Sequence, residues 1–310
     1  MNTKPLVSVV VVVYNSSKTI IDTLDSIAQQ SYKNIELVVS DDASKDDTVS
    51  LVREWMGKHK ADFKDVTIVT TLKNSGISQN CDRGVRASHG EWIKIIAGDD
   101  MLFPCAIERF VEEATKGQGD FFFAQVEMFV DDPKNMVSRY YDVFYSEAYD
   151  IFRRGYSAEE QYEIIRYSNN FCPAPAAFFS RIGFDVIGGF DLSIAMAEDM
   201  PMWLNATQKG FRLNFIDEPL VRYRIGSGSV QIGGRFAVTK RLLKYKYLLQ
   251  IDDLGVCKDI KQINGYDSLS NRCRFILLKL LSIKEIRLFR AKAKEVSLKY
   301  GVKARQITLA

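Results

Sequence analysis

Four pairs of adjacent acidic residues are the features of this 310-residue sequence most able to do chemistry. They are Asp41-Asp42, Asp46-Asp47, Asp99-Asp100 and Glu198-Asp199. Neighbouring carboxylates repel each other, so such pairs indicate a bound cation or a set of hydrogen-bond donors. Mg²⁺ or Mn²⁺ is the cation that oxygen ligands of this kind favour, and it commonly bridges one or two carboxylates to a diphosphate. A solvated turn with no ligand is the alternative for each pair.

The first third of the sequence alternates strand and helix signals, and these elements would position two of the acidic pairs. Residues 7–14 form a continuous, mostly β-branched run, which predicts a strand covered on both faces. Further strands are predicted at residues 35–40, 66–70 and 92–97, with helices at 19–30, 48–58 and 78–88. This order predicts an α/β fold with a doubly wound, mainly parallel sheet flanked by helices. Asp41-Asp42 and Asp99-Asp100 both follow strand ends, where such sheets bind ligands.

The rest of the chain divides into a second group of elements and a basic tail. Helices are predicted at residues 159–167 and 201–209, strands at 213–216 and 220–225, and core-packing strands and loops in the aromatic-rich residues 120–151. Glycines between residues 226 and 234 indicate a boundary, so the predicted domains are residues 1–230 and residues 231–310. The tail has 18 Lys or Arg and 6 Asp or Glu, a net charge of +12; since the whole chain carries +3, residues 1–230 carry −9.

The basic tail is predicted to be a mostly helical C-terminal extension. Between residues 272 and 300, apolar and basic positions mix in a pattern compatible with an amphipathic helix. Such a helix could rest on an anionic membrane, or it could pack its apolar face on the core or on a second subunit. The aromatic residues of the tail do not interleave with the basic ones as a stacking platform would, so we expect no nucleic-acid partner.

The cysteines and the apolar segments of the sequence limit the cellular locations that the protein can have. The five cysteines are odd in number and include no CxxC pair, which argues against a disulfide framework or a zinc knuckle. No cleavage site follows the first apolar run, and no stretch approaches the roughly twenty apolar residues that cross a bilayer. We therefore expect a soluble or peripheral protein that is cytoplasmic, at the inner face of the cytoplasmic membrane if the tail binds lipid.

A set of motifs follows in order along the chain: VSVVVVVYN at residues 7–15, DDASKDDT at 41–48, NSG at 74–76, GEWI at 90–93, GDD at 98–100, GGFD at 188–191 and the pair Glu198-Asp199. This set resembles the motifs of the family 2 inverting glycosyltransferases with the GT-A fold, of the bacterial surface-polysaccharide type. The resemblance covers roughly residues 5 to 230, and the tail lies outside it.

The resemblance implies a nucleotide-sugar site. Tyr14 would stack on the base, and Asp42 would accept a hydrogen bond from an N–H of uracil or thymine. Val12, Asp99 and Arg224 are further expected donor-binding residues, with Arg224, or alternatively Arg222, on the diphosphate. Core packing is the alternative for Tyr14. Asp46 and Thr48 are interpreted as helix-entry residues, with Ser44 or Asp46 as the cap.

The resemblance also implies a metal and a general base. Asp100, with Asp99, would bind Mn²⁺ or Mg²⁺, and Asp199 would take the proton of the acceptor hydroxyl. Glu198 is expected to orient or cap the following helix and, with Phe190 and Asp191, to lie on the acceptor side. A purely structural acidic helix start is the alternative for Asp199.

These expectations add up to an inverting glycosyltransferase that moves a sugar from a UDP- or dTDP-sugar to a hydroxyl of a saccharide or lipid-linked acceptor, in polysaccharide or glycolipid assembly. Two departures from the family pattern favour an alternative, a non-catalytic GT-A-fold protein that binds nucleotide sugars or acts as a scaffold. Ala97 stands where the family usually has the leading Asp, and no His follows Tyr223-Arg224. A nucleotidyltransferase or a dinucleotide oxidoreductase is disfavoured, because no glycine-rich loop follows the first strand.

Overall fold

The computed structural model describes residues 4–117, 119–131, 149–168, 174–192, 198–225 and 283–304. The chain divides into two compact units. The first comprises Met1–Tyr162 and Phe171–Gly226, and the second comprises Glu163–Asn170 and Ser227–Ala310. The sheet and all the candidate site residues belong to the first unit.

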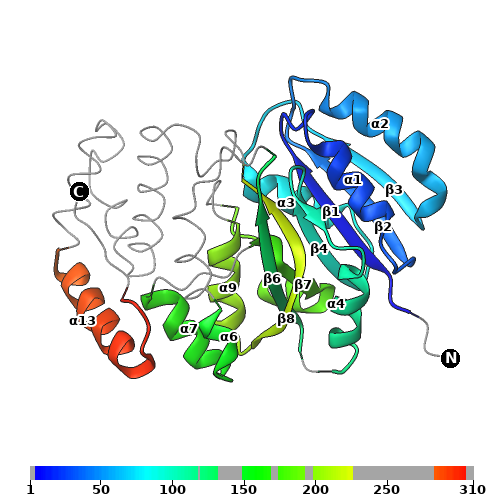
Figure 1. Cartoon of the computed structure of the whole chain (residues 1–310). Helices are drawn as coiled ribbons and strands as arrows, with labels where there is room; N and C mark the ends of the chain where they lie inside the picture. The colour runs from blue at the N-terminus through cyan, green and yellow to red at the C-terminus, as the bar shows by residue number, and fades with distance from the viewer. Residues whose placement is uncertain are drawn as a thin grey trace, which may run out of the picture. The chain divides into compact units, whose positions relative to one another are not determined.

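An eight-stranded, mainly parallel sheet forms the centre of the first unit (Figure 1). Strand β1 (Val7–Val13) is buried along its whole length and pairs in parallel with β2 (Ile35–Asp41) and β4 (Trp92–Ala97). The remaining strands are β3 (Asp65–Thr70), β5 (Met101–Leu102), β6 (Phe121–Phe129), β7 (Ala177–Ser180) and β8 (Leu213–Arg224). Their order is β3-β2-β1-β4-β7-β6-β8-β5, and all except β5 and β7 run in one direction. The carboxyl ends of β1, β2, β4, β6 and β8 therefore lie along one edge.

Helices flank this sheet, as the alternation in the sequence predicts (Figure 1). They are α1 (Ile20–Ala28), α2 (Thr48–His59), α3 (Ile77–Arg86), α4 (Ala106–Ala114), α6 (Asp150–Arg153), α8 (Arg181–Ile187) and α9 (Asp199–Gln208), with the 3-10 turns η1 (Lys60–Asp62) and η4 (Ala174–Ala176). Helix α3 packs on β1 and β2, and Gly84 permits its close approach. A Cβ at Gly84 would lie 2.4 Å from Cγ1 of Val10, which only a glycine avoids.

The predicted elements of the first third are confirmed, with ends shifted by about one or two residues. The prediction of separate strands at residues 213–216 and 220–225 is wrong, because both belong to β8. Strand β8 continues alongside β6 across an irregularity, where Ala124 is opposite Ile216 and Gln125 is opposite Pro219. Pro219 has no N–H to donate to the ladder, and a bulge accommodates it without ending the strand.

One lysine is buried in the interior of the sheet. Lys94 of β4 is fully buried, and its Nζ donates to the carbonyl oxygens of Ile95 at 3.0 Å, Ala177 at 3.2 Å and Pro175. Burial lowers the pKa of Lys94 to about 7. Lys94 therefore ties β4 to the chain that enters β7.

The second unit is described at the end of α7 (Ala158–Tyr167) and at α13 (Ile283–Tyr300). The rings of Tyr167 and Phe289 lie 5.1 Å apart, and the Glu163 carboxylate accepts hydrogen bonds from Lys299 at 3.1 Å and from the Tyr300 hydroxyl at 2.8 Å. Helix α13 buries an apolar stripe of Phe289, Ala293, Val296 and Tyr300. The described part of the predicted amphipathic helix thus packs its apolar face, while residues 272–282 lie outside the described residues. Among the helices that the structure describes, none has the length and apolar character to cross a bilayer.

Candidate functional site

The carboxyl ends of three neighbouring parallel strands meet at one edge of the sheet. Strand β1 lies between β2 and β4, with Val13 opposite Asp41 and Val12 opposite Ala97. Val12 is buried, and its carbonyl oxygen accepts a hydrogen bond from the Gly98 N–H at 3.0 Å. The residues that follow the strand ends, and so share this edge, are Tyr14, Asp42, Asp99 and Asp100.

Tyr14 offers an exposed aromatic ring directly after the buried strand β1. Its side chain is 47% exposed, so the alternative that Tyr14 packs in the core is wrong. The turn that presents it is held by Asn15, whose N–H donates to Ser44 Oγ at 2.8 Å and whose Oδ1 accepts from the Lys45 N–H at 2.7 Å. These bonds join the turns after β1 and β2. An exposed ring on a braced turn is suited to stacking on a planar base.

Asp46 braces the turn after β2, although the N-cap position of α2 is occupied by Asp47 and not by Ser44 or Asp46 as predicted. Its carboxylate accepts hydrogen bonds from the Thr48 N–H at 3.1 Å, the Thr48 hydroxyl at 2.5 Å and the Ser17 N–H at 3.0 Å. Partial burial opposes ionisation, but these donors outweigh it and lower the pKa of Asp46 to about 2. Asp46 thus has a structural role at the start of α2.

Asp42 is buried, and donors of the chain itself surround its carboxylate. It accepts hydrogen bonds from the Ser75 hydroxyl at 2.6 Å, from the Gly76 N–H at 2.8 Å, from the Ser75 N–H at 2.9 Å and from Nη2 of Arg83 at 3.2 Å. Gly76 adopts a φ of 93°, which favours glycine there. Asp42 therefore fixes the loop before α3 against β2. Its contact with a base stays a prediction, and any base must share a carboxylate with these donors.

Ser75 and Arg83 are site residues that the sequence analysis missed. Arg83 projects from α3 to Asp42 and also donates to Ser75 Oγ at 2.7 Å. The NSG motif at residues 74–76 was recognised, but only the fold brings it against Asp42. The one sequence signal that could have indicated Arg83 is the presence of a cationic residue in the helix that follows this motif.

Asp100 is the most deeply buried carboxylate of the edge. It has no solvent exposure; its Oδ1 accepts a hydrogen bond from the Arg224 backbone N–H at 3.0 Å, and its Oδ2 has no partner among the described residues. Burial, and next the charge of Asp99, raise the pKa of Asp100 well above its ordinary value. Burial also raises the pKa of Asp99. The charges of Arg224 and, for Asp100, of Lys94 lower these pKa values, but they do not outweigh burial.

The pair fits a hard divalent cation. A buried carboxylate oxygen without a partner is costly, and an ion is one of the few groups that relieves it. Across the described ranges, no cluster of three or more His, Cys, Asp or Glu side chains could hold a metal. The unpartnered Oδ2 of Asp100 fits an ion that takes one or two carboxylates and completes its shell with water or phosphate oxygens, as Mg²⁺ does.

Arg224 lies at the end of β8 and is engaged by its own chain. Nε donates to the Asp99 carbonyl oxygen at 2.9 Å, Nη2 to Asp22 at 2.7 Å, and Nη1 to Asp131. The guanidinium carbon lies 4.7 Å from the centre of the Phe129 ring, and the residue is buried. The predicted contact of Arg224 with a diphosphate stays a prediction. Asp22 and Asp131 were missed, because they are distant from Arg224 in sequence.

Glu198 and Asp199 open helix α9. Asp199 accepts a hydrogen bond from the Met200 N–H at 2.7 Å, whereas Glu198 makes no capping bond, so the capping role predicted for Glu198 is wrong. Burial, and next the charge of Asp199, raise the pKa of Glu198 to about 8. Burial and then the charges of Glu198 and Asp199 raise the pKa of the Cys81 thiol, so the pair lies close to α3. The raised pKa favours the protonated form of Glu198, which can donate a hydrogen bond.

Replacing Glu198 by glutamine should flatten the pH dependence of stability. The folded state holds a proton on Glu198 between its ordinary pKa near 4.5 and about 8, where the unfolded state has lost it. Protonation of Glu198 therefore stabilises the folded state by an amount on the order of a few kcal/mol. This stabilisation is fully present at low pH and is lost as pH rises. We expect E198Q to match wild type near pH 5 and to exceed its melting temperature at pH 8. E159Q, an exposed change on α7, is the control; parallel pH curves for wild type and E198Q would contradict the expectation.

The predicted acceptor-side turn follows α8. Gly188 and Gly189 adopt φ values of 87° and 76°, and Phe190 is buried with its ring 5.2 Å from that of Phe184. Asp191 is exposed. A Cβ built on Gly189 would lie 3.7 Å from Oδ1 of Asp82, a buried oxygen with no partner among the described residues. Phe190 thus has a packing role, and Asp82 is a further acidic group beside this turn that the sequence analysis missed.

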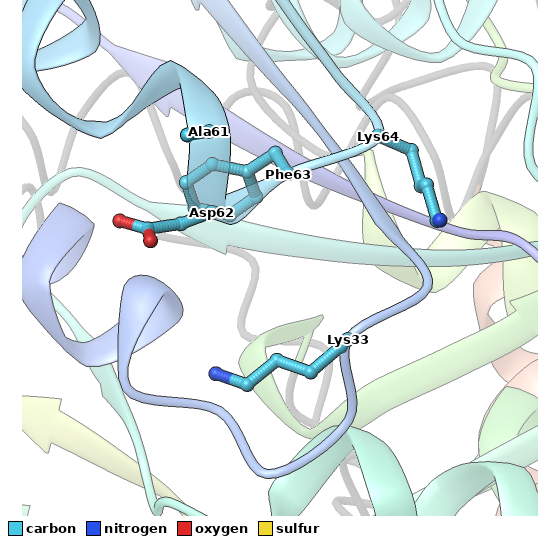
Figure 2. Close-up of a pocket in the computed structure, with 5 residues that line it drawn as sticks. All are labelled: Lys33, Ala61, Asp62, Phe63 and Lys64. Atoms are coloured by element: carbon cyan, nitrogen blue, oxygen red, sulfur yellow. The ribbon is translucent and has the colours of Figure 1, made fainter.

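A separate pocket of about 320 Å³ lies at the opposite end of β2. Figure 2 shows its lining residues on the turn before β2, on η1 and on the segment between η1 and β3: Lys33, Ala61, Asp62, Phe63 and Lys64. The N–H of Lys64 donates to the carbonyl oxygen of Ile35, the first residue of β2. Because Asp42 and Asp99 follow the carboxyl ends of the strands, this pocket is not part of the site described above.

Comparison with protein families matches residues 8–188 to the model described as "Glycosyl transferase family 2". Among curated proteins, the chain is 27% identical over 206 residues to chondroitin synthase of Escherichia coli, covering 66% of this chain and 27% of that protein. It is 25% identical over 234 residues to the UDP-Glc:alpha-D-GlcNAc-diphosphoundecaprenol beta-1,3-glucosyltransferase WfaP of Escherichia coli, covering 73% of this chain and 79% of WfaP. The chain spans between 27% and 39% of the length of two of its relatives.

Among solved structures, the first unit's architecture is shared with TarS of S. aureus. Residues 1–349 of TarS in complex with UDP-GlcNAc align with a TM-score of 0.60 at 17% identity, covering 94% of this chain and 83% of those 349 residues. This likeness identifies the fold as GT-A, as predicted from the sequence.

Proposed function

The chain belongs to glycosyl transferase family 2, and from that premise we propose that it transfers a sugar from a UDP- or dTDP-sugar to an acceptor hydroxyl with inversion at the anomeric carbon. The observation that carries the proposal is the buried, unpartnered Oδ2 of Asp100 at the strand edge that also holds Tyr14 and Asp42. Such an edge can take a base, a diphosphate and a cation together. The first unit would be the catalytic domain.

The base would stack on the exposed ring of Tyr14, and its N–H would approach Asp42. Uracil and thymine both have an N–H flanked by two carbonyl groups, which suits a carboxylate acceptor. The TarS complex with UDP-GlcNAc supports a uridine nucleotide in a fold of this kind. Val12 would contribute through the strand end that carries Tyr14.

Asp99 and Asp100 would hold Mn²⁺ or Mg²⁺, which offsets the negative charge that develops on the leaving diphosphate. Asp199 would accept the proton of the acceptor hydroxyl while that oxygen bonds to the anomeric carbon and the bond from this carbon to the diphosphate breaks. Glu198, whose raised pKa favours its protonated form, would add little charge beside the base and could donate a hydrogen bond to a substrate oxygen. No covalent intermediate with the protein is needed, because one displacement inverts the centre.

A non-catalytic protein that binds nucleotide sugars is the second candidate, favoured by Ala97 and by the lack of a His after Arg224. A donor screen separates the two. The full chain would be incubated with Mn²⁺ or Mg²⁺ and a panel of UDP-, dTDP- and GDP-sugars, with release of nucleoside diphosphate and the melting temperature as readouts. Turnover of one UDP- or dTDP-sugar that chelation abolishes supports the enzyme; stabilisation without turnover on any supplied acceptor supports the binding protein. No turnover and no stabilisation contradict both.

For the acceptor, we propose a saccharide or lipid-linked saccharide at the inner face of the cytoplasmic membrane, in polysaccharide or glycolipid assembly. The name of WfaP includes a diphosphoundecaprenol acceptor, which supports a lipid-linked one here. Helix α13 exposes Leu288 and Leu298 among basic residues, a composition that suits the surface of an anionic bilayer.

Neutralising two exposed cations of α13 should weaken binding to anionic vesicles. We expect R287Q/K294Q to bind phosphatidylglycerol vesicles roughly 30-fold less than wild type, since each cation near the surface contributes about 1 kcal/mol. The matched control is R53Q/K60Q, which removes two exposed cations from the first unit. Flotation with these vesicles and with neutral phosphatidylcholine vesicles measures the effect. Equal flotation of wild type and both variants would exclude membrane binding through α13.

A further inference from the structure

The environment of Arg224 differs from that of a phosphate-binding arginine. Such a residue presents its fork of N–H groups to a ligand, whereas all three nitrogens of the Arg224 guanidinium donate to oxygens of the chain itself. The side chain is only 7% exposed. Its partners come from the turn after β4, from α1 and from the residues after β6. Arg224 therefore joins three parts of the chain that are far apart in sequence.

Two contacts of Arg224 reach the carboxylate pair directly. Its backbone N–H donates to Oδ1 of Asp100, and its side-chain Nε donates to the carbonyl oxygen of Asp99. The first contact leaves Oδ2 of Asp100 as the atom without a partner, and the second fixes the peptide between Asp99 and Asp100. Helix α1 adds a further restraint, since the Thr23 hydroxyl donates to the Asp100 carbonyl oxygen at 2.7 Å.

Asp22 and Asp131 determine where the guanidinium sits. Their side chains are more than half exposed, so as isolated ion pairs they would contribute little to stability. A planar guanidinium held at three nitrogens, however, has a single orientation, and a lysine ammonium cannot reproduce it. The two carboxylates therefore act on geometry more than on stability.

We propose that Arg224 is a positioning residue that preforms the cation site at Asp99-Asp100 before any nucleotide binds, with Asp22 holding the guanidinium in place. This inference rests on the proposed function and deepens it, because it names what prepares the carboxylates. It also differs from a direct contact of Arg224 with the diphosphate, because each of the three guanidinium nitrogens already donates to an oxygen of the chain.

The test measures Mn²⁺ binding to the full chain without nucleotide, by electron paramagnetic resonance of free Mn²⁺. The variant R224K keeps the charge and loses the fork, so any change in affinity reports geometry. We expect R224K to bind Mn²⁺ roughly 10- to 100-fold more weakly, as for other residues that orient metal ligands. The matched control is R222K, on the same strand, where a half-buried arginine pairs with Glu127 at 3.3 Å.

A double-mutant cycle with Asp22 keeps the test informative if R224K is destabilised. D22N changes a half-exposed residue and removes one negative charge, which alone weakens Mn²⁺ binding slightly. If Asp22 acts through Arg224, D22N/R224K binds Mn²⁺ no more weakly than R224K; if it acts only through its charge, the two losses multiply. Melting temperatures of all variants identify any that fail to fold.

Two results would overturn the inference. One is R224K with wild-type Mn²⁺ affinity and a weakened affinity for UDP, which would assign Arg224 to the phosphates. The other is a wild-type protein that binds Mn²⁺ only when UDP is present, which would mean that the site is not preformed. Either result leaves sugar transfer intact in the donor screen, so the failure of the inference is distinguishable from the failure of the proposed function.

Discussion

Replacing Asp199 by asparagine should lower kcat for sugar transfer by about 10²- to 10⁴-fold, the usual contribution of a general base. Asparagine keeps the size of the side chain, and its Oδ1 can still accept the hydrogen bond from the Met200 N–H. The start of α9 is therefore retained while the proton acceptor is lost. Single-turnover rates with a donor from the screen measure the effect, and the UDP-induced rise in melting temperature should stay at the wild-type value.

The control for this change is D185N, which removes an exposed carboxylate from α8, the helix that contacts α9. It should leave the rate of transfer unchanged. If D199N retained more than a tenth of wild-type kcat, another group would have to take the proton. Asp82 would then be the first alternative, because its Oδ1 is buried and unpartnered beside the Gly188–Gly189 turn.

Asp100→Asn should abolish metal-dependent turnover without destabilising the metal-free protein. Loss of a cation that contributes several kcal/mol to the transition state corresponds to a decrease in kcat of about 10²- to 10³-fold or more. In the metal-free protein, by contrast, the substitution should not lower the free energy of unfolding. The raised pKa of Asp100 means that its ionisation costs stability as pH rises above the ordinary value of 3.8, and an amide does not ionise.

Melting curves at several pH values, with and without Mn²⁺, check both parts of this prediction. Wild type should be stabilised by Mn²⁺ and D100N should not, while at pH 8 metal-free D100N should melt no lower than metal-free wild type. The control D47N changes an exposed acidic residue in the turn after β2 and should respond to Mn²⁺ as wild type does. A Mn²⁺ response in D100N equal to that of wild type would remove Asp100 from the cation site.

Local sequence patterns were sufficient to place the strand ends and the residues that follow them. A β-branched run followed by a polar turn predicts where a parallel strand stops, and parallel strands share their carboxyl edge. Tyr14, Asp42 and Asp99-Asp100 could therefore be brought together without coordinates. The same reasoning predicted two strands, at residues 213–216 and 220–225, where the single strand β8 continues through an irregularity beside Pro219.

The residues that support the site from distant parts of the sequence show no such local pattern. The contact between Asp22 and Arg224 joins α1 to the end of β8, and the contact of Asp131 joins the end of β6 to the same guanidinium. Each of these acidic residues has the sequence signature of an ordinary exposed aspartate. Their relation to Arg224 depends on the order of strands in the sheet, which a single sequence does not specify.

Chemical labelling of the buried Lys94 can report the unfolding of the first unit. Among the lysines that the structure describes, Lys94 is the one without solvent exposure, and an amine-reactive label cannot reach it while β4 and the entry to β7 stay together. Its labelling rate therefore follows the population of molecules whose sheet has opened, in the way that amide exchange does. Mass spectrometry of the peptide that carries Lys94 would follow unfolding of the first unit separately from the second, without an engineered probe.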